Sequence, residues 1–154
     1  MIKYYFIIFF ILIINIANTK PIYNEQQLRS ILYNHSKIAE GFPFILGIHF
    51  YNNKDGKVIQ LEFETDSINT GAMILAMNSL AKVGQFSKTP LNNFIVINHY
   101  KDSDTPISYK SNADCAINYF VKNQITKRNW MKDCLSNSIT QLEAQNWLEL
   151  NLGK

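Results

Sequence analysis

The alternation of apolar and polar side chains at 59–64, within the segment 57–65, most constrains what this chain can fold into. Positions 59, 61 and 63 are apolar, whereas positions 60, 62 and 64 are polar. This is the pattern of a strand with one buried face. An apolar segment at 44–51 comes before it, and the sequence NKDG at 53–56 separates the two. Because Gly56 suits the left-handed backbone of a tight turn, the two segments predict a β-hairpin.

Helical and extended patterns elsewhere complete the expected order of elements. Asn24 is a suitable cap for the first helix, and a capping box from Ser111 to Asp114 begins a later one. The expected elements are a helix at 22–40, strands at 44–51 and 57–65, a helix at 68–83, a strand at 94–100, a helix from the 111–114 capping box to a break at 123–126, a shorter helix that includes 130–135, and a last helix at 140–152.

These elements predict an α+β fold in the order α-β-β-α-β-α-α-α. The sheet would be three-stranded and mainly antiparallel, with helices over its apolar face and a helical hairpin near the C-terminus. The composition, 47% apolar and 18% charged, is that of a globular protein, and we expect one domain over 20–154. The formal charge is only +3 and the basic residues are scattered, so we expect no nucleic-acid partner.

The first 19 residues predict a secretory signal peptide. Lys3 is followed by an unbroken apolar run at 4–14, then by Asn15 and small or polar residues. A helix that spans a membrane needs about 20 apolar residues, so an uncleaved anchor is the weaker alternative. We therefore expect a secreted or periplasmic protein that starts near Lys20, with no stable membrane span after the signal is removed.

The two cysteines, Cys115 and Cys134, predict a disulfide in such an oxidising compartment. The midpoint between them falls in the expected break at 123–126. If the chain folds back there as an antiparallel helical hairpin, the two residues lie opposite each other. The alternatives are two separate buried thiols and a catalytic cysteine, for which no histidine base can be identified from the sequence.

The weak catalytic candidates are His49, His99 and Glu62, which lie on the three expected strands. In some strand registers His49 shares a polar sheet face with Glu62, and such a pair could act as acid and base or as half of a metal site. The plainer interpretation is a solvated sheet face, since such faces commonly carry Glu, Gln and His. The sequence leaves both open.

The turn at 53–56 also resembles part of an EF-hand calcium loop. Asn53, Asp55, Gly56 and Glu62 match positions of that pattern, but Tyr51 stands where the first carboxylate is required. The flanks alternate with the period of a strand, so a plain turn explains every residue. We expect no metal and no cofactor.

Trp130 and Trp147 lie on the two expected C-terminal helices. They are most simply core residues. The alternative is that one of them anchors a partner, because Trp is favoured at protein interfaces.

No motif in the chain specifies a reaction, since phosphate loops, nucleophile elbows and zinc signatures are all missing. The leading hypothesis is a non-enzymatic binding protein that acts on another protein outside the cytoplasm, as an effector, an inhibitor or an envelope-associated factor. One alternative is a small secreted hydrolase that uses a His/Glu pair. The other is a small-molecule or lipid-binding module.

Overall fold

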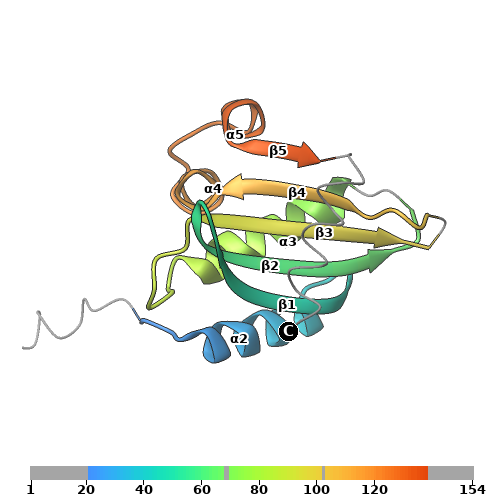
Figure 1. Ribbon diagram of the computed structural model, residues 1–154, viewed down its shortest axis with the longest axis horizontal. Helices are drawn as coiled ribbons and strands as arrows, with labels where there is room; N and C mark the ends of the chain where they lie inside the picture. Colours follow the sequence, from blue (N-terminus) through green and yellow to red (C-terminus); the bar gives the residue numbers. More distant parts are fainter. Residues whose placement is uncertain (1–20, 68–69, 102, 139–154) are drawn as a thin grey trace, which may run out of the picture.

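A computed structural model describes residues 21–67, 70–101 and 103–138 (Figure 1). In these ranges five strands form one mixed sheet, in the order β1-β2-β3-β4-β5, and four helices accompany it. The elements are α2 (Glu25–Ile38), β1 (Phe44–Asn53), β2 (Gly56–Thr65), α3 (Thr70–Gly84), β3 (Asn93–Tyr100), β4 (Ile107–Asn112), α4 (Ala113–Phe120), α5 (Lys127–Asp133) and β5 (Leu135–Ser138). The expected signal peptide and the expected helix at 140–152 lie outside the described residues.

The predicted hairpin is confirmed. β1 and β2 pair antiparallel, and Asn53 lies opposite Gly56 across the turn. Gly56 has a φ of 107°, and the Asp55 amide donates to Asn53 Oδ1 at 2.9 Å. The local turn chemistry therefore sets the register of β1 against β2, and with it the sheet face on which each of their side chains lies.

The expectation of three strands was wrong, although the α+β class is confirmed. After β2, helix α3 crosses over so that β3 runs parallel to β2, and β4 and β5 then add antiparallel. Both added strands are short and carry few apolar residues, namely Ile107 and Tyr109 in β4 and Leu135 in β5. They are strands because each pairs with a neighbour that is already in the sheet. Ser111 therefore belongs to β4, and Asn112 caps α4 by accepting the Cys115 amide at 3.1 Å.

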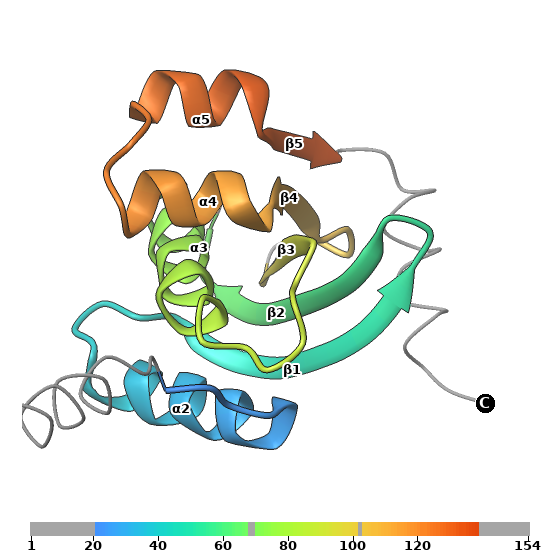
Figure 2. The same cartoon turned by 90° about the vertical axis from the view of Figure 1, so that its left-hand side faces the viewer.

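All four helices contribute to the core on one face of the sheet, and Figure 2 shows them on that side. The opposite face carries a smaller buried apolar group of Val58, Ile95 and Ile97, with Tyr51 packed against it. The alternation along β2 and β3 thus separates a main core from a second face where polar and apolar side chains mix. None of the helices in the described ranges is both long and apolar enough to cross a membrane.

Helices α4 and α5 form the antiparallel hairpin that the sequence predicts (Figure 2). Cys115 near the start of α4 and Cys134 at the end of α5 are joined by a disulfide, with their Cα atoms 6.2 Å apart. The apolar side chains of α5 are only partly buried. Trp130 is fully buried, but Met131 is 42% exposed.

Candidate functional sites

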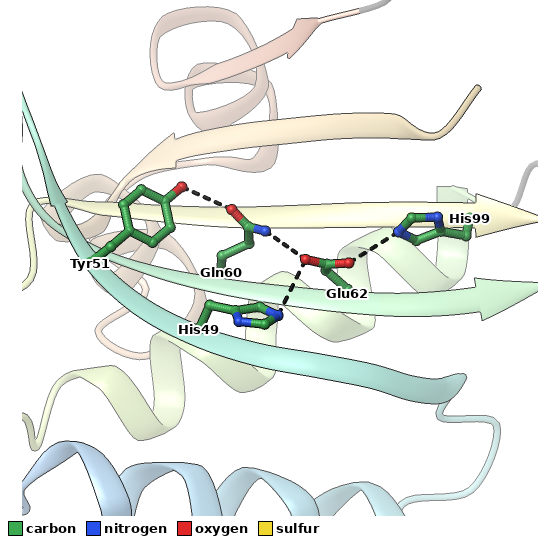
Figure 3. Close-up of polar contacts among 5 residues, drawn as sticks. All are labelled: His49, Tyr51, Gln60, Glu62 and His99. Atoms are coloured by element: carbon green, nitrogen blue, oxygen red, sulfur yellow. Dashed lines mark hydrogen bonds and ion pairs between the residues drawn. The ribbon is translucent and has the colours of Figure 1, made fainter. Parts of the chain in front are cut away.

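The structure brings the three catalytic candidates together on the sheet face opposite the helices (Figure 3). His49 comes from β1, Glu62 from β2 and His99 from β3. In the register of the sheet, the Cα of His49 pairs with Gln60 and that of Glu62 with Ile97, so both histidines lie diagonally to the glutamate. Neighbouring strands are close enough for such diagonal side chains to touch. We call these three residues the histidine–glutamate cluster.

Each oxygen of the Glu62 carboxylate contacts one imidazole. His99 Nε2 lies 3.2 Å from Oε2, and His49 Nε2 lies 3.4 Å from Oε1. Gln60 Nε2 also donates to Oε1 at 2.7 Å, and Tyr51 in turn donates its hydroxyl to Gln60 Oε1 at 2.8 Å (Figure 3). The amide of Gln60, which is fully buried, therefore holds the carboxylate in place from within the sheet.

Electrostatics fix the charge states of this network. The hydrogen bond from His99 lowers the pKa of Glu62. The Gln60 amide and the charge of His49 lower this pKa further, whereas partial burial raises it. Burial, together with the nearby Glu62 charge, raises the pKa of Tyr51 to about 12. At neutral pH the network therefore contains an ionised carboxylate and a protonated phenol.

This arrangement leaves both imidazoles accessible on the face of the sheet. An ionised carboxylate can only accept a hydrogen bond, so in the contact between His99 and Glu62 the ring donates through Nε2. Within the described residues, no other group bonds Nδ1 of either ring. The side chains of His49 and His99 are 40% and 30% exposed, which leaves them open to water or to a ligand. An imidazole held by a carboxylate is a common acid–base device.

Gly47 makes room for this contact, and the sequence analysis missed it. Its Cα pairs with Glu62 across a β-bulge between Ile45 and Gly47. A Cβ added at Gly47 would lie 2.6 Å from Nε2 of His49, so the ring occupies the space that a side chain would fill. A glycine inside an otherwise apolar strand is the available sequence signal, since such glycines mark bulges and close approaches.

Asp55, the acidic residue of the turn at 53–56, is paired with a lysine. The Asp55 carboxylate accepts a hydrogen bond from Lys110 Nζ at 2.7 Å, which lowers the pKa of Asp55. The hydroxyl of Tyr51, at the first position of the supposed loop, bonds Gln60 instead. Across the part of the chain that the structure describes, no three His, Cys, Asp or Glu side chains are grouped so as to hold a metal ion.

Trp130 is a core residue in the structure. It stacks on Tyr119 with ring centroids 5.2 Å apart, meets Phe120 edge-on at 4.8 Å, and donates its indole N–H to Ser111 Oγ at 3.0 Å. Because the ring is fully buried, it cannot anchor a partner on the surface. Trp147 lies outside the described residues.

The exposed apolar side chains point to a different surface. Five large ones are more than 40% exposed in the described ranges, and three of these lie at the end of α2 or among the first residues of β1. They are Ile38, Phe44 and Leu46, with 83%, 73% and 45% of their surface exposed, and we call them the junction patch. Leu46 is exposed at the β-bulge, where it has no residue opposite it on β2. The sequence analysis placed these residues in a regular helix and strand and missed their exposure.

Two surface hollows are lined mainly by polar residues. One lies beside the start of α2, against Tyr23 and Lys88. The other lies next to the junction patch, against Pro43, Glu64 and Asp66. The two carboxylates in the lining of the second hollow do not favour a lipid, because lipid sites are predominantly apolar.

Comparison of the chain with protein-family models, with curated proteins and with solved structures finds no match.

Proposed function

We propose that this protein is exported and acts outside the cytoplasm as a non-enzymatic binding protein for another protein. The observation that carries the proposal is the junction patch. Ile38 at the end of α2 and Phe44 and Leu46 at the start of β1 expose large apolar side chains within one short stretch of the chain. β1 is an edge strand, and its partner in the described sheet is β2. Concentrated apolar exposure is typical of protein interaction surfaces.

Two further features support export. The apolar run at 4–14 has the layout of a secretory signal. The Cys115–Cys134 disulfide suits an oxidising compartment, since cytosolic thiols are kept reduced. Intact-mass analysis of the exported protein should give a chain that starts near Lys20. A full-length mass in a carbonate-resistant membrane fraction would contradict export of a mature chain.

The binding proposal is tested by affinity purification from the surroundings into which the protein is exported. The mature wild-type protein and a Phe44→Ser/Leu46→Ser variant serve as baits. Met131→Ser is the matched control, because Met131 is also an exposed large apolar residue but lies on α5. We expect a partner with wild type and with the control, and its loss with the patch variant. Equal recovery with all three baits, or no specific partner for wild type, would refute the proposal.

The histidine–glutamate cluster favours a second candidate, a small secreted hydrolase. His99 and His49 on one carboxylate could each take a proton from water as it attacks an ester or amide carbonyl. Chromogenic ester and amide substrates would be tested with wild type, His49→Ala and His99→Ala. Turnover that is lost in the variants while their folded spectra are kept would favour the hydrolase. Equal background rates would leave the binding function as the better proposal.

A further inference from the structure

The hollow beside the junction patch carries negative charge. It has a volume of about 270 Å³ and is lined by Gly41, Pro43, Glu64, Asp66 and neighbouring small residues. Phe44 of the patch follows Pro43 directly, and its Cα pairs with that of Glu64. Phe44 of the patch therefore lies beside the hollow, at the start of β1.

The two carboxylates of the hollow are available to a partner. Glu64 forms no ion pair with any other residue in the described part of the chain. Asp66 is bridged by Lys101 at 2.7 Å, but its side chain is 88% exposed and that of Lys101 is 62% exposed. Ion pairs so open to water are weak, so a cation from a partner can compete for Asp66.

The β-bulge limits how a partner can use this edge. Leu46 is the extra residue between Ile45 and Gly47, and it interrupts the regular ladder of β1. Bulges on edge strands disfavour the addition of a further strand. A partner would therefore contact this surface through its side chains, and its apolar side chains would pack against Phe44 and Leu46.

We propose that the occupant of this surface is a segment of a partner protein in which a lysine or arginine lies beside a large apolar side chain. The apolar residue packs on the junction patch, and the cation enters the hollow between Glu64 and Asp66. This inference rests on the proposed binding function and adds the chemistry of the partner. Charge complementarity of this kind selects partners more than it adds affinity.

The test uses phage-displayed random 12-residue peptides selected on the full mature protein, followed by fluorescence anisotropy with the enriched synthetic peptides. We expect enriched peptides to carry Lys or Arg within two positions of a large apolar residue. Their Kd should weaken about tenfold for Glu64→Gln/Asp66→Asn, which corresponds to about 1.4 kcal/mol. Asp114→Asn/Asp133→Asn is the matched control, because it removes the same charge from exposed positions on α4 and α5 and should leave Kd unchanged.

The outcomes separate the two proposals. Peptides that depend on Phe44 and Leu46 but contain no basic residue, or that ignore the Glu64/Asp66 variant, would overturn the inference and leave the binding surface intact. Basic peptides that bind the Phe44→Ser/Leu46→Ser variant as well as wild type would also overturn it, since charge alone would then explain them. If no enriched peptide depends on Phe44 or Leu46, the proposed binding function of the junction patch is itself refuted.

Discussion

Removal of the Cys115–Cys134 disulfide should destabilise the protein by a predictable amount. The two residues are separated by 19 positions, so the bond closes a loop of that size in the unfolded chain. On the chain-entropy model such a crosslink contributes roughly 3 kcal/mol to the free energy of unfolding. For a domain of this size that corresponds to a fall in Tm of roughly 10 °C.

The double variant Cys115→Ala/Cys134→Ala should nevertheless stay folded. Trp130 keeps its stacking on Tyr119 and its edge contact with Phe120, and these contacts join α5 to α4 without the bond. The variant should therefore show the circular dichroism of wild type at low temperature. Its unfolding should come at lower urea concentration and with a steeper dependence on urea, because the unfolded chain without the crosslink exposes more surface.

Urea titration followed by circular dichroism measures the effect, with and without a reducing agent. Reductant should lower the stability of wild type toward that of the double variant and should leave the variant itself unchanged. Thiol labelling of the exported protein should find no free cysteine among residues 115 and 134. A stability difference below about 1 kcal/mol, or equal sensitivity of both proteins to reductant, would refute the loop-closure reasoning.

Three further predictions concern the sheet and its core. Gly47→Ala should displace the His49 ring from Glu62. It should change the stability by less than about 1 kcal/mol, because the added Cβ meets only the far end of the flexible His49 side chain. The imidazole resonances in NMR spectra would show the displacement, and an unmoved ring would contradict it. The pKa of Glu62 is lower in the folded than in the unfolded state, so the stability that it contributes is present above about pH 4.5 and is lost as the pH falls through the folded pKa. When the free energy of unfolding is measured against pH, its decrease at acid pH should be shallower for Glu62→Gln than for wild type. An identical decrease would argue against the contact. Trp130→Phe removes the hydrogen bond to Ser111 and also leaves a cavity in the core. Chemical denaturation should therefore show a loss of stability that is smaller, by roughly 1 kcal/mol, in a Ser111→Ala background, and an equal loss in both backgrounds would argue against the hydrogen bond.

Local chemistry could be predicted from the sequence because it depends on residues close together in the chain. The hairpin over 44–65 follows from apolar alternation and a turn sequence that includes Gly56. The pairing of Cys115 with Cys134 follows from the even spacing of two residues about a helical break. Strands β4 and β5 did not follow, because such short segments become strands only when they can pair with a strand that is already in the sheet.

The candidate sites depended on contacts that no local pattern contains. The sequence suggested His49, His99 and Glu62 as candidates, but only the strand register could bring both histidines onto one carboxylate. A shift of one residue in that register would have turned the same side chains to the opposite face of the sheet. The sequence by itself thus determined which local elements form and which residue types they carry. The tertiary structure decided which of those side chains meet and which, like Phe44, remain exposed, because pairing and burial are set by neighbours that are distant in the chain.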